Sequence, residues 1–422
     1  MLDKLVRFNM YFEECVNFFL RNSKNEKMLG FEYETIPINI ENPNTPVTYF
    51  GRKGIYSILN ELIECGYSPI IINKFLSGAT KNDIRITIEP GGQIEFSCDP
   101  RNNVIDIYHS LKDFLFDMSS VCGDSISLHS VGYHPFCSTH DIDVIPCPRY
   151  QNITSLLDCC DTQKLTASMQ CSLDYSNRID AGKRIRLASF IQPYLAGFFG
   201  NSFLCNGHYS GFVSYRTKCL REFDKGRSGV PDFIWSDDFI NNSYELYTEW
   251  AFQKEIFYII RDNEVKKMNG ITFQDYIKRN EYDVQVCDWV SHLSTLYPDA
   301  RLKNVIELRS CDSCPPDRAM IFLSIIKGLM YCDEILDECL YRFRKTTKEN
   351  VEYNYNAISK DGVFSMDHSG IPVRKVLKEL ANLAIKGLEN IGKEDEIENV
   401  MKIGRRITSY DSVIYDESCK IL

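Results

Sequence analysis

Few features of disordered, fibrous or membrane-spanning chains occur in this sequence. Its 422 residues include only 23 Gly and 15 Pro, too few for a low-complexity or collagen-like protein. No apolar run reaches the length that a membrane-spanning helix requires, and Glu13, Glu14 and Asn17 interrupt the apolar stretch that a secretory signal would need. We therefore expect a folded cytoplasmic protein without a membrane partner.

The sequence also lacks an excess of positive charge, and its number of cysteines is odd. Lys and Arg number 48 against 58 Asp and Glu, which gives a formal net charge of −10 and argues against nucleic acid as a partner. The 17 cysteines are an odd number, so full disulfide pairing would leave one thiol over, and reduced thiols are the simpler expectation. None of these features indicates an oligomeric state.

Short strand patterns and longer helical patterns alternate irregularly along the chain. Apolar residues at helical spacing predict helices in 5–19, 103–119, 244–262, 317–343 and from Pro372 onward. Alternating or β-branched segments predict strands in 31–36, 84–89, 93–97, 170–175, 212–216 and 305–309. This irregular order predicts an α+β fold with a curved, mainly antiparallel sheet. We expect a single domain over 1–422 that is mainly helical from about residue 317.

The segment IRITIEPGGQIEFS at 84–97 predicts a β-hairpin with two different faces. Apolar residues alternate with polar ones on both sides of the turn Pro90-Gly91-Gly92. With a three-residue loop, the polar residues pair across the strands, as Arg85 with Ser97, Thr87 with Glu95 and Glu89 with Gln93. The hairpin should therefore be apolar towards the core and carry acids, amides and hydroxyls on its open face.

Five glutamates fall on polar strand faces of this kind: Glu32, Glu34, Glu89, Glu95 and Glu307. Taken singly, each segment is explained by a strand with a solvated polar face. Gathered on one sheet, close carboxylates repel in pairs by roughly 1 to 4 kcal/mol, so cations must offset them. Oxygen ligands without clustered His or Cys favour Mg²⁺ or Mn²⁺, which also hold substrate phosphates. Replacing Glu95 or Glu307 by Gln is then expected to abolish activity while keeping or raising the melting temperature of the metal-free protein.

Several segments, in chain order, resemble one family, the ATP-dependent glutamate-cysteine ligases of the plant and bacterial type. GFEYE at 30–34 is similar to its Gly-x-Glu-x-Glu strand, and IEPGGQIEFS at 88–97 to its Glu-Pro-Gly-Gly-Gln-x-Glu hairpin. DWVSHLSTLYPDARLKNVIELRSCD at 288–312 is similar to its Asp-Trp-x-x-His-Leu-x-Thr to Glu-x-Arg signature. VGYHPF, PRY, MQCSLDYS, GNSF and SYRTKCLREFDKGRSG also fall where the family has counterparts. The resemblance implies a glutamine synthetase-like fold, with a bowl-like active site and helices on its outer face.

The same resemblance implies an activity and a set of site residues. The activity is ATP-dependent ligation of the γ-carboxylate of L-glutamate to the amino group of L-cysteine through γ-glutamyl phosphate. By motif, the five glutamates would hold Mg²⁺, Arg309, Arg227 and Glu307 would be catalytic, and Arg149, Arg227 and Arg309 would bind the nucleotide. Gln170, Ser172, Asn201, Ser202 and Arg216 would line the substrate site.

Departures from the family pattern leave the acceptor amine open. The family usually carries Asn or His at Ser172, Pro at Phe203, Trp at Leu220 and Lys at Cys147. A γ-glutamyl ligase for a different amine is therefore an alternative, and the abundance of cysteine keeps a non-catalytic thiol sensor on the ligase fold as another. Retention of the five glutamates and Arg309 favours an enzyme.

Two cysteine- and histidine-bearing segments suggest other chemistry less strongly. His129, His134, Cys137 and His140 are close in sequence but match no compact zinc module. Cys311 and Cys314 form a Cys-x-x-Cys pair that does not open a helix in the thioredoxin-like pattern, so packing thiols are favoured over a redox pair.

Overall fold

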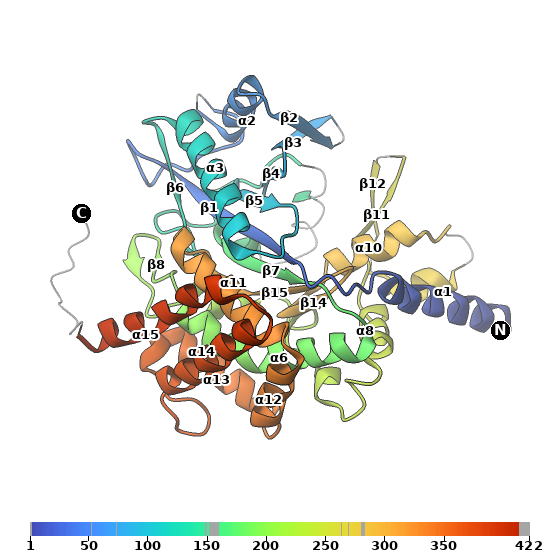
Figure 1. The fold of residues 1–422 in the computed structure, drawn as a ribbon. Coiled ribbons are helices and arrows are strands. Elements are labelled where there is room, and N and C mark those ends of the chain that lie inside the picture. Colours follow the sequence, from blue (N-terminus) through green and yellow to red (C-terminus); the bar gives the residue numbers. More distant parts are fainter. Residues whose placement is uncertain are drawn as a thin grey trace.

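A large antiparallel sheet forms the centre of the fold (Figure 1). The computed structural model describes residues 2–51, 53–72, 74–147, 150–151, 160–262, 264–268, 270–279 and 283–412. Within these residues the largest sheet has nine strands in the order β14-β15-β7-β1-β5-β4-β3-β2, with β6 also paired to β1. Its strands are β1 (Leu29–Asn39), β2 (Ser68–Ile72), β3 (Phe75–Lys81), β4 (Ile84–Ile88), β5 (Ile94–Cys98), β6 (Ile126–His129), β7 (Ser168–Leu173), β14 (Ala300–Leu302) and β15 (Ile306–Asp312).

The hairpin of β4 and β5 has the predicted register. Arg85 lies opposite Ser97 and Thr87 opposite Glu95, while the Glu89 amide donates to the Gln93 carbonyl at 2.9 Å. Gly92 closes the turn at φ +88°, a conformation that costs glycine little because it has no Cβ. The even-numbered isoleucines are buried, so the hairpin divides into an apolar and a polar face as expected.

Helices cover the apolar face of the sheet. Phe31 and Tyr33 of β1 and Phe96 of β5 are fully or almost fully buried. The helices α3 (Val104–Cys122), α6 (Arg178–Phe198) and α11 (Pro316–Met330) contact the strands of this sheet. One continuous hydrophobic core runs from Cys15 to Ile403. In Figure 1, α6 and α11 to α15 gather on one side of the sheet, and α2 and α3 lie beside β2 to β5. The predicted α+β class and mainly antiparallel sheet are confirmed.

The remaining elements are mostly helical towards the C-terminus, in agreement with the sequence. The helices are α1 (Leu2–Arg21), α2 (Ile55–Glu64), α3 (Val104–Cys122), α5 (Cys160–Leu165), α6 (Arg178–Phe198), α7 (Tyr215–Glu222), α8 (Ser243–Phe252), α9 (Phe273–Lys278), α10 (Val286–Ser294), α11 (Pro316–Met330), α12 (Asp333–Phe343), α13 (Lys348–Asp361), α14 (Val373–Asn390) and α15 (Ile397–Ser412). In the described part of the chain, three further sheets have two strands each. They are formed by β8 (Leu204–Cys205) with β9 (His208–Tyr209), β10 (Ser228–Gly229) with β13 (Tyr297–Pro298), and β11 (Tyr258–Arg261) with β12 (Glu264–Lys267). The single-domain boundary of 1–422 stays a prediction.

Three predicted elements differ from the structure. The helix predicted over 317–343 forms two helices, α11 and α12, which are separated by Tyr331 and Cys332. The segment 212–216 is not a strand, because the Ser214 hydroxyl accepts from the Thr217 amide and caps the N-terminus of α7. The helix predicted over 244–262 ends at Phe252, since Ile259 and Ile260 belong to β11, which pairs with β12. A capping hydrogen bond and a pair of β-branched residues thus override the local pattern.

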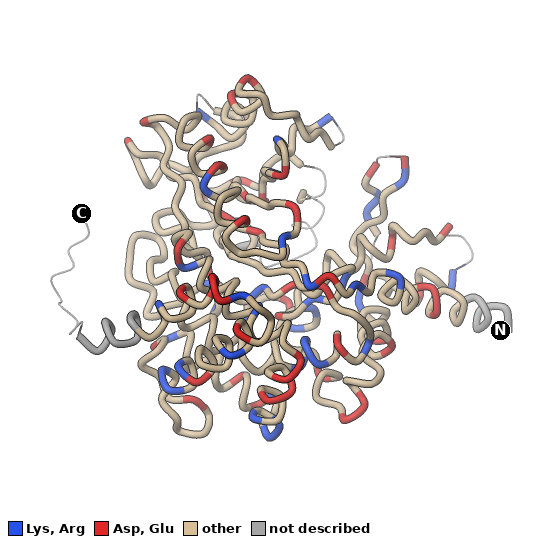
Figure 2. Tube along the Cα trace, in the orientation of Figure 1, with Lys and Arg blue, Asp and Glu red and all other residues tan. Residues whose placement is uncertain are grey.

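Charges of both signs are distributed over the whole trace. Figure 2 shows Lys and Arg interspersed with Asp and Glu along the chain rather than separated onto different halves. No described helix is long and apolar enough to cross a bilayer.

Candidate active site

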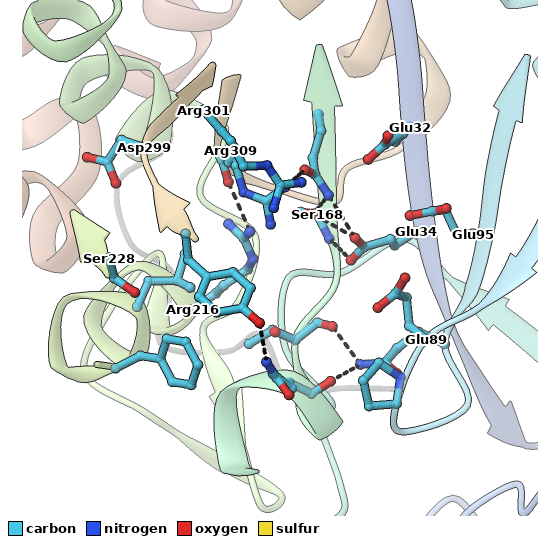
Figure 3. A pocket seen from close by; sticks show the side chains of 18 of the residues that line it. Glu32, Glu34, Glu89, Glu95, Ser168, Arg216, Ser228, Asp299, Arg301 and Arg309 are labelled. Atoms are coloured by element: carbon cyan, nitrogen blue, oxygen red, sulfur yellow. Dashed lines mark hydrogen bonds between the residues drawn. The ribbon is translucent and has the colours of Figure 1, made fainter. Parts of the chain in front are cut away.

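The polar face of the sheet lines a cleft of ≈ 200 Å³, closed on its other side by α7 and the segment that leads into β14. Two walls of opposite charge meet in it. Figure 3 shows the labelled glutamates Glu32, Glu34, Glu89 and Glu95 on one side and the arginines Arg216, Arg301 and Arg309 on the other.

The acidic wall is built by β1 and the β4–β5 hairpin. Glu34 of β1 lies directly opposite Glu95 of β5, and Glu32 lies opposite Ser97 on one side and Gln170 on the other. Glu89 follows β4 at the turn, where the Tyr150 hydroxyl donates to its Oε1 at 3.4 Å. Because side chains alternate along strands, this pairing places the carboxylates on the same face.

Burial and mutual repulsion raise the pKa values of these carboxyl groups. The pKa of Glu95 lies well above its ordinary value, first because the side chain is removed from water and then because Glu32, Glu89 and Glu34 repel its charge. Burial also raises the pKa of Glu32, with Glu307 as the next contributor. For Glu34, burial outweighs hydrogen bonds from the Ser168 amide at 2.6 Å and the Ser168 hydroxyl at 3.0 Å. The wall holds more negative charge than its own donors neutralise.

The basic wall presents the guanidinium groups of Arg309 and Arg216, which are held in place by hydrogen bonds to neighbouring residues. Arg309 is on β15, and its Nη1 donates to Gln170 Oε1 at 2.5 Å and lies 3.3 Å from Glu307 Oε2. Arg216, in the first turn of α7, donates to the carbonyls of Cys311 at 3.2 Å and Arg309 at 3.0 Å. The buried Nε of Arg216 has no acceptor among the described residues. Both arginines line the cleft, so each has donor capacity for an anionic ligand.

Glu307 is enclosed by cations instead of facing the open cleft. Arg301 Nε and Nη2 lie 2.6 and 2.5 Å from its Oε2, and Lys303 Nζ donates to Oε1 at 2.8 Å. Burial alone would raise the pKa of Glu307, but Arg301, Lys303 and Arg309 together hold it well below the ordinary value. Its nearness to Glu32 agrees with the predicted clustering, whereas both of its oxygens already accept from basic side chains. The metal-ligand role stays a prediction, with Glu307 as the least accessible of the five.

Other residues assigned to the site from sequence lie away from the cleft. Asn201 and Ser202 bind Asp312: the Asn201 amide donates to Oδ2 at 2.9 Å and the Ser202 hydroxyl at 2.6 Å. Arg227 is buried over the Phe257 ring and donates to the Glu255 carbonyl at 2.6 Å. Ser172 pairs with Gly30 and Glu307 in the sheet and does not line the cleft. None of these four is among the residues that line the cleft, and their assigned roles stay predictions. Arg149 lies outside the described residues.

The cleft also contains residues that sequence reasoning passed over. Arg301 lies opposite Glu307 in the β14–β15 hairpin, and the alternation in ARLKNVIEL around a Lys303 turn was a usable signal. Arg221 forms an ion pair with Asp299. Three buried atoms there, Asp299 Oδ2, Arg221 Nε and Ser228 Oγ, have no hydrogen-bond partner among the described residues. Local sequence patterns do not predict this group of Arg221, Ser228 and Asp299, because the three residues come from α7, β10 and the loop before β14.

The carboxylate oxygens of the cleft are ligands that suit Mg²⁺, although they are not arranged as a complete set of ligands around one ion. Within the described part of the chain, no three His, Cys, Asp or Glu side chains are placed to hold one ion jointly. Mg²⁺ in proteins usually takes one or two carboxylates and completes its shell with water and phosphate oxygens. The four glutamates of the acidic wall therefore suit an ion that enters together with a phosphorylated ligand.

The two weaker motifs are structural. His134 is buried, and its Nδ1 accepts from the Cys137 amide at 2.9 Å, while burial lowers its pKa to about 4. Cys311 and Cys314 are buried on and just after β15, and the Cys314 thiol donates to the Phe199 carbonyl at 3.0 Å. Neither segment adds a metal or redox centre to the cleft.

Comparison with known proteins identifies relatives along almost the whole chain. Residues 28–408 match the family described as Glutamate-cysteine ligase family 2 (GCS2). The chloroplastic glutamate–cysteine ligase of Medicago truncatula is 25% identical over 382 residues, which cover 88% of this chain and 74% of the relative. Glutamate–cysteine ligase B of Oryza sativa subsp. japonica, also chloroplastic, is 26% identical over 385 residues, with coverage of 88% and 74%.

A solved structure supports the fold. The glutamate–cysteine ligase of Francisella tularensis, crystallised in complex with AMP, superposes with a TM-score of 0.53 at 12% identity, over 92% of this chain and 82% of that one. At this identity the likeness concerns the arrangement of helices and strands.

Proposed function

The chain belongs to glutamate-cysteine ligase family 2 and is a ligase, and from this premise we propose that it joins the γ-carboxylate of L-glutamate to the amino group of L-cysteine at the expense of ATP. The proposed route is transfer of the terminal phosphoryl group of ATP to the γ-carboxylate, followed by attack of the amine on γ-glutamyl phosphate and release of phosphate. A carboxylate is a poor acylating agent, so phosphorylation supplies the leaving group that amide formation requires.

The observation that carries this proposal is the opposition of two charged walls in one cleft. Phosphoryl transfer between a nucleotide and a carboxylate brings several negative groups together, and catalysis depends on positioning them and neutralising their charge. Arg309 and Arg216 supply fixed donors on one wall. The four glutamates of the other wall would hold Mg²⁺, which when bound neutralises phosphate charge.

The donors of the basic wall are preorganised by protein contacts. Arg309 is held by Gln170, which in turn donates to Glu34 Oε1 at 3.1 Å, so one amide connects the two walls. Arg301 is held by Glu307 and by the carbonyls of Ser294 and Leu296. These contacts fix the guanidinium groups before a ligand arrives, which lowers the reorganisation needed during reaction.

The corner of Arg221, Ser228 and Asp299 would take an amino-acid substrate. An α-amino acid carries an ammonium group that a carboxylate such as Asp299 accepts and a carboxylate that a guanidinium binds. The unpartnered buried atoms there are one acceptor, one donor and one hydroxyl that can do both.

The acceptor amine is the part of the proposal with a specific alternative. Leu220 lines the cleft, as do Phe223 and Pro298, and the family usually has Trp at the position of Leu220. Leucine leaves more room there than an indole, so an acceptor larger than cysteine is the second candidate.

We also propose the cytoplasm as the location.

The test is a turnover assay with purified protein, ATP, Mg²⁺ and L-glutamate against a panel of amines. ADP release and the product mass should both depend on the acceptor, with L-cysteine giving γ-glutamylcysteine. A different preferred amine would select the second candidate. ADP release that no acceptor stimulates, or no ADP release at all, would contradict the ligase proposal and favour a binding protein.

A further inference from the structure

A second cavity, of ≈ 330 Å³, lies at the far end of β7, where the strand leads into α6. We call it the β7–α6 cavity. It shares no lining residue with the cleft. Its lining includes Lys24 and Lys27 from the segment between α1 and β1, Asp174 and Arg184 from the β7–α6 region, and Asp333 from α12. Asp174 follows Gln170 by four residues, about 13 Å along an extended chain.

Arg184 is the residue that points to a ligand. It is 2% exposed, its Nε donates to Asp180 Oδ1 at 2.7 Å, and its guanidinium lies 4.8 Å from the centre of the Tyr331 ring. Its Nη1 is buried and has no acceptor among the described residues. An unpaired donor of a buried charged group is costly, so an acceptor supplied by a ligand would restore the missing hydrogen bond.

The acids near Arg184 are already occupied by other donors. Asp180 Oδ2 accepts from the Ser176 amide at 2.8 Å and the Ser176 hydroxyl at 3.1 Å. Asp174 Oδ2 accepts from the Met28 amide at 3.1 Å. Neither carboxylate accepts from Arg184 Nη1, which has no hydrogen-bond acceptor among the described residues.

The lysines, by contrast, keep donors to spare. Lys24 Nζ is 3.9 Å from Asp174 Oδ1, beyond hydrogen-bond distance. Lys27 Nζ donates to the Tyr331 carbonyl at 2.9 Å and lies 3.8 Å from Asp333, although an ammonium group has three N–H donors. The N-terminus of α6, a 21-residue helix capped by Asn177, adds positive potential at the same cavity.

We propose that the β7–α6 cavity binds a small oxyanion, a carboxylate or phosphate group, on Arg184, Lys24 and Lys27. Three independent features agree on the sign of the ligand: a buried guanidinium N–H without an acceptor, two incompletely engaged ammonium groups and a long helix N-terminus. Planar guanidinium groups favour ligands with two oxygens on one centre, which both candidate groups have.

Two lining residues of the cavity, Lys27 and Asp174, lie next to the start of β1 and the end of β7. The Tyr331 hydroxyl accepts from the Asp174 amide at 3.0 Å and donates to the Met28 carbonyl, so one phenol joins the end of β7 to the start of β1. Arg184 packs on that same ring. Ordering of Arg184 by an anion would therefore also order the chain on either side of Tyr331.

Hydrogen–deuterium exchange with mass spectrometry tests the proposal because it separates the two sites. The full-length protein is compared in buffer, in inorganic phosphate, in glutarate, and in sodium chloride of matched ionic strength. Peptides covering 24–28, 174–184 and 331–336 should exchange more slowly in phosphate, in glutarate, or in both, and not in sodium chloride. Protection in one anion alone identifies the phosphate or the carboxylate as the preferred group. Protection confined to cleft peptides such as 297–309, or absent altogether, overturns the proposal.

A matched pair of variants places the effect in the cavity. Ile179 lines it, is 45% exposed and lies in the first turn of α6, where a glutamate is compatible with the helix. Ile179→Glu should raise the anion concentration for half-maximal protection by about tenfold or more through charge repulsion. Ile179→Gln, of the same size and uncharged, should leave it nearly unchanged. Equal protection in both variants would show that the anion binds elsewhere.

Discussion

Arg301 and Glu307 face each other across the β14–β15 hairpin, with Arg301 Nε 2.6 Å from Glu307 Oε2. Lys303 binds the other carboxylate oxygen, and Arg309 approaches from the same strand. The carboxylate is therefore the anchor of a buried cationic cluster. Its removal would leave three basic side chains facing one another with no counter-charge.

We expect Glu307→Gln to be destabilised, in contrast to the expectation from crowding alone. Removing one partner from a buried ion pair costs about 3–5 kcal/mol, because the remaining charges lose compensation. Thermal unfolding should show a clearly lower melting temperature than wild type, with Glu41→Gln, an exposed loop residue, as the control. An unchanged melting temperature would show that the cluster does not depend on Glu307.

Glu95→Gln should behave in the opposite way. Glu95 is repelled by Glu32, Glu89 and Glu34, so an uncharged amide relieves repulsion, while the Thr87 hydroxyl that donates at 2.6 Å can still bond to the amide oxygen. The melting temperature without divalent cations should hold or rise, and turnover should fall about 100-fold if Glu95 helps to hold the cation. Wild-type turnover at saturating Mg²⁺ would contradict that role.

The stability of the metal-free protein should depend on pH through the acidic wall. The folded-state pKa values of Glu32, Glu34 and Glu95 are raised, so their favourable contribution is complete below the unfolded pKa and is lost as pH rises through the folded values. The melting temperature of Glu95→Gln minus that of wild type should therefore increase from pH 5 towards neutrality. Added Mg²⁺ should reduce the difference, and a difference independent of pH would show that Glu95 titrates normally.

Arg309→Lys should lower kcat more than it changes the KM for glutamate. Lysine keeps the positive charge but not the planar fork that can hold two oxygens while Nη1 contacts Gln170. Loss of one such preorganised donor costs roughly 10² to 10³ in turnover. Steady-state kinetics of ADP formation measure both parameters. A raised KM with unchanged kcat would make Arg309 an anchor for bound substrate instead of a group that acts in phosphoryl transfer.

Ser202→Ala should lower stability without a matching loss of catalysis. The Ser202 hydroxyl donates to Asp312 Oδ2, and burial raises the pKa of that carboxyl group despite its hydrogen bonds. Leaving a buried acceptor short of a donor costs about 1–3 kcal/mol. Denaturant unfolding should show this loss, with Ser210→Ala as a control whose hydroxyl makes a longer bond of 3.3 Å. A large drop in kcat/KM at unchanged stability would place Ser202 in contact with substrate.

The sequence predicts the faces of the strands better than the partners of its polar residues. The alternation around Pro90-Gly91-Gly92 is local, so the hairpin register and the shared face of Glu89 and Glu95 follow from it. The capping of α7 by Ser214 depends on a single hydrogen bond that a strand-like pattern conceals.

A sequence motif predicts the local structure of a segment more reliably than it predicts which of its side chains enter the cleft. Arg227 and Arg216 lie in one stretch of sequence, yet Arg216 lines the cleft and Arg227 packs on Phe257. Which way an arginine turns is decided by residues distant in sequence, here Cys311 for Arg216 and Glu255 for Arg227. The counter-ions of Glu307 and the Arg221–Asp299 corner likewise require the packed structure.

The central position of β1 has a consequence for the synthesis of this protein on the ribosome. Leu29 of β1 pairs with Leu173 of β7, and β7 gains its own outer neighbour only when Ile306 of β15 has been made. At about 5–20 residues per second, one edge of β1 stays uncovered for roughly 7 to 30 s after the strand emerges. An open, largely apolar strand edge is a template for pairing with another chain. The yield of folded protein should therefore depend on chaperones that bind nascent chains, more strongly than for a protein whose strands pair with sequence neighbours.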